Sequence, residues 1–219
     1  MIQLSYSQVN RDLLKTMEPP GKLYYAILAL DLAVLAWGIY AWTYQFRTGM
    51  GVTGLNNPVG WGVYIATFVF WIGIAHSGTL ISAILFLFRC RWRNPIYRTA
   101  EAMTVIAVMT AALYPIIHLG RPWLFYWLLP YQQRGHLWIN FRSPLVMDVF
   151  AVATYFIVSA AFFFTGLVPD LAVVRDKAVG WRKRFYTFLA QGWEGTDREW
   201  RHYSSAYLLL AALATRTSW

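Results

Sequence analysis

The sequence has few charged residues for its length. Only 13% of the 219 residues are charged, whereas 58% are hydrophobic. A water-soluble domain carries roughly a quarter charged residues. The single cysteine, Cys90, excludes an internal disulfide framework and a cysteine-based metal site within this chain. The composition therefore indicates a membrane protein.

Several cofactor motifs are also missing. There is no glycine-rich phosphate-binding loop, no CxxC and no CxxCH motif. The net charge of +9 could suggest nucleic acid, but the basic residues cluster between long apolar runs. That distribution is typical of anchoring at the membrane edge, beside lipid. We therefore expect no nucleic-acid partner.

Four apolar segments are long enough to cross a bilayer, which takes about 20 residues. They cover residues 23–43, 61–88, 101–119 and 144–167. A fifth apolar run begins at Tyr203 and ends after about a dozen residues, which is too short to span. The predicted fold class is an all-α polytopic membrane protein, with an antiparallel four-helix transmembrane bundle and the start of a fifth helix.

The domain organisation follows from these segments. Residues 1–22 form a polar arm without the apolar core of a signal peptide. Residues 23–167 form the four-helix bundle, residues 168–202 a polar loop of mixed charge, and residues 203–219 an incomplete fifth helix. Lys and Arg number fourteen in the arm and the second and fourth loops, against four on the other side. The positive-inside rule then places the N-terminus, and the loop 168–202, in the cytoplasm.

The third and fourth segments carry a candidate site where they meet the connector 121–143. His118 closes one segment and Asp148 lies about one turn inside the next. Gly120, Arg121 and Pro122 are a helix-stop signal, and Ser143 with Pro144 is a start signal. Consecutive antiparallel helices end and begin at similar depth, so we expect His118 and Asp148 to converge near the outer, periplasmic face. They could hold and deprotonate a small polar head group.

Each of these residues also has a simpler explanation. Asp148 could merely favour the helix dipole, and His118 could be an interfacial histidine at a helix end. Arg121 could hold anionic lipid as easily as ligand. The aromatic connector, with Tyr131 and Trp138 among its residues, would cap the head group.

Other polar residues lie deeper in the apolar segments. Asp31, His76 and Thr79 could form a proton path, or hydrogen bonds that only hold helices together. Glu101 is expected at the cytoplasmic rim beside Arg98, where it would be solvated.

A haem site within the chain is not expected. His76 lies about 22 Å below the outer start of its segment, whereas His118 lies within a turn of the outer edge. The two histidines cannot both ligate one haem, and no second histidine pair exists. The electron carriers, haem and iron–sulfur clusters, must therefore be on partner subunits.

Four stretches carry a more specific signal: NPVGWGVYIATFVFWIGIAHSGTLISAILFLFR, NPIYRTAEAMT, YPIIHLGRPW and FRSPLVMDVFAVATYF. Together they resemble the NrfD/PsrC family of quinone-interacting membrane subunits, and most closely its alternative complex III branch. The resemblance covers residues 10–210. It implies the front half of an eight-helix fold made of two four-helix bundles, because this sequence ends where the fifth helix should continue.

The resemblance also implies a function. The chain would be a membrane subunit of a quinol oxidoreductase in the bacterial inner membrane, oxidising menaquinol or another quinol at the periplasmic face. His118 and Asp148 match the quinol-contacting residues of the family, and His76 and Asp31 match its polar mid-membrane positions. The implied partners are a periplasmic iron–sulfur subunit, multihaem cytochrome c subunits and other membrane subunits, including an NrfD-like paralogue. A structural anchor without a quinol site and a proton-translocating subunit remain alternatives.

Overall fold

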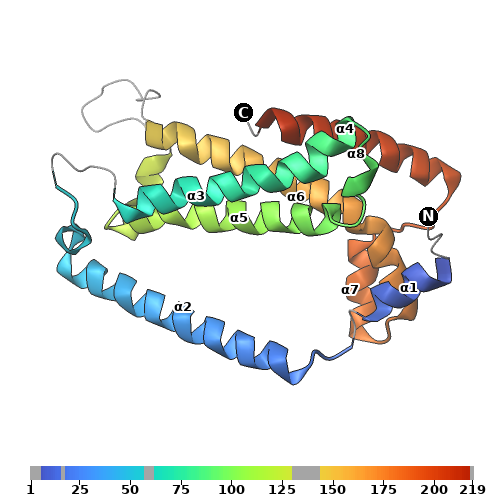
Figure 1. Ribbon diagram of the computed structural model, residues 1–219, viewed down its shortest axis with the longest axis horizontal. Helices are drawn as coiled ribbons and strands as arrows, with labels where there is room; N and C mark the ends of the chain where they lie inside the picture. The colour runs from blue at the N-terminus through green and yellow to red at the C-terminus, as the bar shows by residue number, and fades with distance from the viewer. Residues whose placement is uncertain (1–5, 16–17, 57–61, 130–143, 218–219) are drawn as a thin grey trace. The chain divides into compact units, whose positions relative to one another are not determined.

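The computed structural model describes residues 6–15, 18–56, 62–129 and 144–217, and these residues form helices and turns without a strand. The α-helices are α1 (Tyr6–Leu14), α2 (Lys22–Thr48), α3 (Val63–Thr79), α4 (Leu85–Leu87), α5 (Tyr97–His118), α6 (Pro144–Lys177), α7 (Trp181–Leu189) and α8 (Asp197–Thr217) (Figure 1). Short 3-10 turns lie at η2 (Met50–Thr53), η4 (Arg91–Arg93) and η5 (Pro122–Leu128), and a π-turn at η3 (Leu80–Ile84).

Four helices are long and apolar enough to cross a membrane. They are Lys22–Thr48, Val63–Leu87, Tyr97–His118 and Val146–Lys177, the second of which joins α3, η3 and α4. Each coincides with one predicted segment, so the predicted fold class is confirmed. The helix α8 is not among the four, as its short apolar run predicted.

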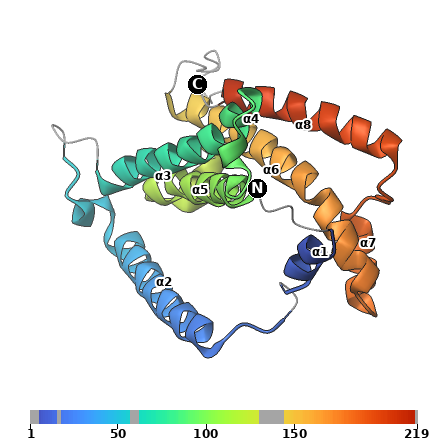
Figure 2. The same cartoon turned by 45° about the vertical axis from the view of Figure 1, so that its right-hand side comes forward.

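The chain divides into two compact units, which are described separately. One comprises residues 1–37 and 164–207, and the other comprises residues 38–163 and 208–219. The second unit contains a core made where α3, α5 and the first half of α6 lie side by side (Figures 1 and 2). Its buried members are Ala75, Ala107, Val108, Val152 and Tyr155.

Small residues let α3 and α5 approach closely. A Cβ atom at Gly78 would clash with Thr104 Oγ1 and would lie 2.8 Å from the Ala100 carbonyl oxygen. Thr104 Oγ1 also donates to the Ala75 carbonyl at 3.3 Å. Small residues at a helix interface allow this kind of packing within a membrane.

These contacts fix the register of the three helices. Ala75 lies level with Thr104, and Gly78 with Ala100, so α3 and α5 are antiparallel. The Thr79 and Tyr155 hydroxyls lie 2.5 Å apart, and α6 runs parallel to α3. Alternate spans run in the same direction, as an up-and-down arrangement requires.

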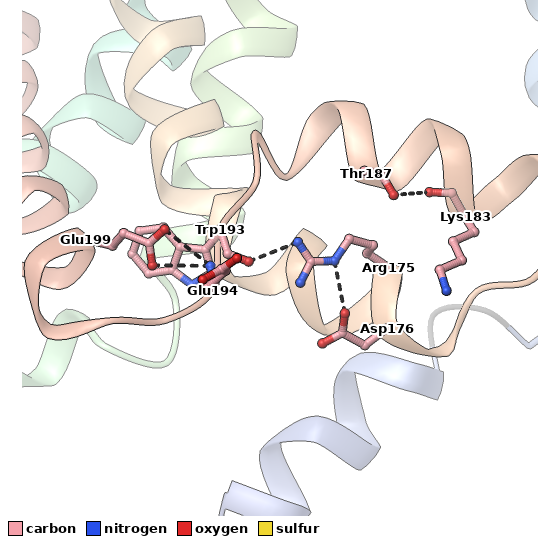
Figure 3. Close-up of polar contacts among 7 residues, drawn as sticks. All are labelled: Arg175, Asp176, Lys183, Thr187, Trp193, Glu194 and Glu199. Carbon is pink, nitrogen blue, oxygen red and sulfur yellow. Dashed lines mark hydrogen bonds and ion pairs between the residues drawn. The ribbon is translucent and has the colours of Figure 1, made fainter.

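The first unit corrects the expectation of a polar loop over residues 168–202. These residues hold the end of α6, all of α7 and the start of α8. Thr196 and Glu199 form a capping box at the start of α8, in which Glu199 accepts from the Thr196 backbone N–H at 2.9 Å. Glu199 also accepts from the Glu194 backbone N–H at 3.2 Å (Figure 3). Arg175 donates to the Trp193 carbonyl at 2.9 Å and so ties α6 to the turn before α8 (Figure 3). The short helix α7 is polar because most of its residues are exposed, not because a helix is absent.

Candidate functional site

An open cavity of about 240 Å³ lies in the second unit, between α3, α6 and the last turn of α8. Its apolar lining residues are Phe68, Ile72, Ala151 and Val152, and its polar ones are His76, Asp148, Tyr155 and Thr217. A carboxyl, an imidazole and a phenol therefore share one mostly apolar hollow. Such a lining suits a ring that carries hydroxyl or carbonyl oxygens.

The phenol of Tyr155 is held by a hydrogen bond with Thr79, a residue that does not line the cavity. Thr79 Oγ1 donates to the Ala75 carbonyl at 3.2 Å and lies 2.5 Å from the Tyr155 hydroxyl. A hydroxyl has one proton to donate, so in this arrangement Tyr155 is the donor to Thr79. The lone pairs of the phenol oxygen are then left to accept a hydrogen bond from another group. Tyr155 is 3% exposed and Thr79 is 2% exposed, so water does not compete for this bond.

The His76 ring lies against the same phenol. The ring centroids of His76 and Tyr155 are 5.5 Å apart with an interplanar angle of 35°. His76 and Asp148 are exposed residues, so both can reach a molecule entering the open cavity. The structure thus brings together three of the predicted residues, His76, Asp148 and Thr79, with Thr79 acting through Tyr155.

The expected convergence of His118 and Asp148 is not found. Counting along the helices from the Thr104–Ala75 contact, His118 lies just before the level at which α3 begins at Val63. Counting back from the Tyr155–Thr79 contact, Asp148 lies level with Ile72. The difference is about eleven residues, or about 16 Å along the helix axes. The prediction assumed that α5 ends at the level where α6 begins. In the structure, α5 continues past the start of α3, whereas α6 begins further along α3, nearer its middle.

His118 has its own surroundings at the outer end of α5. Its Nδ1 atom is buried and has no hydrogen-bond partner among the described residues. The next turn requires Gly120, whose φ is +66° and where a Cβ atom would lie 2.8 Å from Met50 Cγ. The η2 segment therefore packs against the end of α5. Arg121, just beyond, is exposed.

Three further expectations have different outcomes. Asp31 is an exposed residue of α2 in the first unit, so its part in a proton path stays a prediction. Tyr131, Trp138 and Ser143 of the connector lie outside the described residues. Glu101 does pair with Arg98, at 3.2 Å, but its solvated position was wrong because its side chain is 0% exposed.

Sequence reasoning missed Tyr155, although a signal was present. Tyr155 follows Asp148 by seven residues, which is the spacing of one helix face over two turns. A tyrosine in an apolar helix is by itself a weak signal, because it is most often a packing residue. In the part of the chain that the structure describes, no three His, Cys, Asp or Glu side chains gather closely enough to hold a metal ion.

Comparison with known proteins gives the family. The family described as polysulphide reductase, NrfD, matches residues 51–215, which is most of the chain. The chain belongs to the NrfD family. It is 26% identical over 212 residues to a protein of Halobacterium salinarum named as a membrane subunit of dimethyl sulfoxide reductase, covering 96% of this chain and 45% of that protein.

A second relative belongs to Archaeoglobus fulgidus and is named as an Hdr-like menaquinol oxidoreductase integral membrane subunit. It is 25% identical over 148 residues, covering 68% of this chain and 35% of the relative. This NrfD-family chain thus spans less than half the length of both relatives. Family membership and the four apolar helices together make it an integral membrane protein.

Proposed function

We propose that this chain binds and oxidises quinol as part of the membrane subunit of a quinol:electron-acceptor oxidoreductase, with the quinol head group in the cavity of His76, Asp148 and Tyr155. The observation that carries the proposal is the placement of a carboxyl, an imidazole and a phenol around one apolar hollow. The names of the two relatives support it, because both are membrane subunits of oxidoreductases and one is named for menaquinol.

The chemistry needs two proton acceptors. Oxidation of a quinol to a quinone releases two protons and two electrons. Asp148 accepts the proton of one hydroxyl and His76 that of the other. Tyr155, which donates to Thr79, keeps its oxygen as an acceptor that orients the head group. Phe68, Ile72 and Val152 contact the ring, and the isoprenoid tail lies outside the cavity along the apolar helices.

The electrons pass to an acceptor on a partner subunit. We propose the alternative complex III type of assembly, in which this chain corresponds to ActC rather than to its paralogue ActF. The partners are then a periplasmic iron–sulfur subunit, multihaem cytochrome c subunits and other membrane subunits, including an NrfD-like one. Menaquinol is the quinol that the Archaeoglobus relative is named for.

His118 and Arg121 have a separate place in this proposal. The sequence predicts that the quinol protons are released on the periplasmic side. There His118 could receive a proton, whereas Arg121 stays protonated and could only bind an anion or a ligand oxygen. About 16 Å of helix lies between the level of His118 and that of Asp148. His118 and Arg121 are therefore proposed as groups on an outer exit and not as contacts of the head group in this cavity.

The test is quinol oxidation by the assembled complex. Asp148→Asn and His76→Ala should each lower turnover at least about tenfold, which is the scale for losing one acid–base partner. Thr67→Val is the matched control, because Thr67 is a partly exposed polar residue of α3 that bonds within its own helix and lies outside the cavity lining. Wild-type turnover in both variants would overturn the proposal and leave a structural anchor. Protection of the cavity by quinol against a photoreactive quinone analogue would separate binding from catalysis.

A further inference from the structure

The helix α7 of the first unit carries an aromatic face that the described residues leave open. Trp181, Phe185 and Phe188 are 73%, 50% and 80% exposed. They recur at spacings of four and three positions, which places them on one side of the helix. The aromatic residues just after α7 differ, because Trp193 packs edge-on against Trp200 at 5.1 Å. A group of large apolar side chains left open in this way marks an interaction surface.

Basic residues border this aromatic face on both sides. With about 100° between successive residues, Arg182 and Arg184 lie about 90° and about 70° from its centre, and Lys183 lies nearly opposite. All three are exposed, and the sequence of α7 contains no acidic residue. Thr187 lies on the far side with Lys183, where its hydroxyl donates to the Lys183 carbonyl at 2.7 Å (Figure 3). The helix is therefore aromatic on one side, cationic along both edges and hydrophilic on the other side.

Both ends of α7 are held close to the end of a membrane span. The helix α6 belongs to the span Val146–Lys177, and α7 begins at Trp181 after three connecting residues (Figure 1). Beyond the other end of α7, the Trp193 carbonyl accepts from Arg175, in the last turn of α6, at 2.9 Å (Figure 3). The chain thus leaves the end of α6 and returns to it.

The length of this span indicates which part of the bilayer α7 meets. A helix of 32 residues is about 48 Å long, whereas the hydrocarbon core is about 30 Å thick and the bilayer with its headgroups about 40–45 Å. The end of α6 therefore reaches the headgroup region. Since α7 is held at that end, its aromatic face and its arginines lie where acyl chains give way to phosphates.

Anionic phospholipid matches both properties of α7 at once. Trp and other aromatic rings are favoured at the boundary between acyl chains and headgroups. An arginine beside them can lay its apolar stem along the rings and direct its guanidinium to a phosphate, with two parallel hydrogen bonds. An acidic protein surface would match the cations but not the aromatic face, and a zwitterionic lipid would match the aromatic face but not the cations. The positive-inside rule predicts the cytoplasmic side, whose leaflet is anionic.

We propose that α7 is an interfacial helix that binds anionic phospholipid. Its aromatic face lies against the first carbons of the acyl chains, the guanidinium groups of Arg182 and Arg184 bind headgroup phosphates, and Lys183 faces the water. A free helix of nine residues would bind a bilayer weakly, but α7 is attached to a span and is already at the surface. The proposal does not depend on the quinol site.

The experiment uses the assembled complex in vesicles made of equal parts of phosphatidylcholine and phosphatidylglycerol. A photoreactive benzophenone analogue of phenylalanine replaces either Phe188, on the aromatic face, or Thr187, on the far side. Mass spectrometry then identifies what each analogue is joined to after illumination. The analogue at Phe188 should form phospholipid adducts, with phosphatidylglycerol exceeding phosphatidylcholine about tenfold or more, because two basic residues act together. The analogue at Thr187 should form few lipid adducts.

Two substitutions that remove the same charge test the role of the arginines. Arg184→Gln should lower the ratio of phosphatidylglycerol to phosphatidylcholine adducts about fivefold, the scale for one basic residue near an anionic surface. Lys183→Gln is the matched control. Lys183 lies about a helix diameter, ~10 Å, further from the phosphates, which is about one Debye length, so the ratio should fall less than about twofold. Both positions are exposed, so both variants should keep the fold.

The outcomes separate lipid from other occupants of the aromatic face. Adducts of the Phe188 analogue with a partner subunit would show that protein covers this face, and would overturn the proposal. Equal lipid adducts at Phe188 and Thr187 would overturn the assigned orientation of α7. A ratio near one in the wild type, or an equal fall in Lys183→Gln and Arg184→Gln, would overturn the binding of phosphate by the arginines.

Discussion

At the scale of single residues, Gly78 shows how closely α3 and α5 approach. A Cβ atom there would lie 2.8 Å from the Ala100 carbonyl, a backbone atom that cannot rotate away. Gly78→Ala should therefore force the two helices apart and destabilise the protein by about 1–3 kcal/mol. Thermal unfolding of the detergent-solubilised complex measures this loss.

The control is on the same helix. Gly73 has nothing within 4 Å of an added Cβ atom, so Gly73→Ala keeps the packing and removes only backbone freedom. It should stabilise the helix by up to about 1 kcal/mol. Equal effects of the two substitutions would contradict the close contact at Gly78.

The residues of the candidate site show which of its features the sequence could predict and which it could not. The chemical types were predictable, since a carboxyl and an imidazole inside apolar segments stand out, and His76 and Asp148 do line one cavity. That Asp148 shares a cavity with His76, and not with His118, was not predictable. It depends on how far α6 is shifted along α3, and this shift is set by contacts such as that between Thr79 and Tyr155, which lie 76 positions apart in the chain.

At the scale of elements, the start of α8 depends on the Glu199 carboxylate. The backbone N–H of Thr196, and further hydrogen bonds from Thr196, Glu194 and Gly195, hold the pKa of Glu199 below its ordinary value. A lowered folded pKa means that the cap contributes stability that is present above the ordinary pKa of a glutamate. That stability is lost as the pH falls through the lowered value.

Hydrogen exchange in the first turn of α8 tests this. In the wild type, exchange corrected for its intrinsic pH dependence should quicken as the pH falls through the acid range. Glu199→Gln should exchange faster at neutral pH and show no such acid step. Glu194→Gln is the matched control, because the structure gives Glu194 a place in the cap through its backbone N–H alone. An acid step that persists in Glu199→Gln would show that another group causes it.

Element boundaries were predictable to different degrees. The four apolar helices were found because a run of about 20 apolar residues has few other uses. The helix α7 and the first turns of α8 fell within the predicted loop 168–202, because their stability comes from a cap at Thr196 and from aromatic contacts such as that of Trp193 with Trp200, at 5.1 Å, and not from a long apolar stretch. The π-turn η3 leaves no mark in composition; within it the Ser82 carbonyl accepts a hydrogen bond from Arg93, eleven positions away, at 2.9 Å.

At the scale of the whole molecule, the direction in which the helices cross the membrane decides what the polar residues mean. The counting of Lys and Arg predicts that the end with Arg93 and Arg98 faces the cytoplasm. The chain offers a direct probe, because its single cysteine, Cys90, is partly exposed in the turn between α4 and η4 at that end.

A membrane-impermeant maleimide should label Cys90 only from the cytoplasmic side of oriented vesicles. Thr48→Cys in a Cys90→Ser background, at the exposed far end of α2, should be labelled only from the periplasmic side. The reverse pattern would invert the orientation. The side of Arg98 would then be periplasmic, and His118 would face the cytoplasm. Labelling therefore decides which compartment lies at each end of the helices, independently of any measurement of turnover.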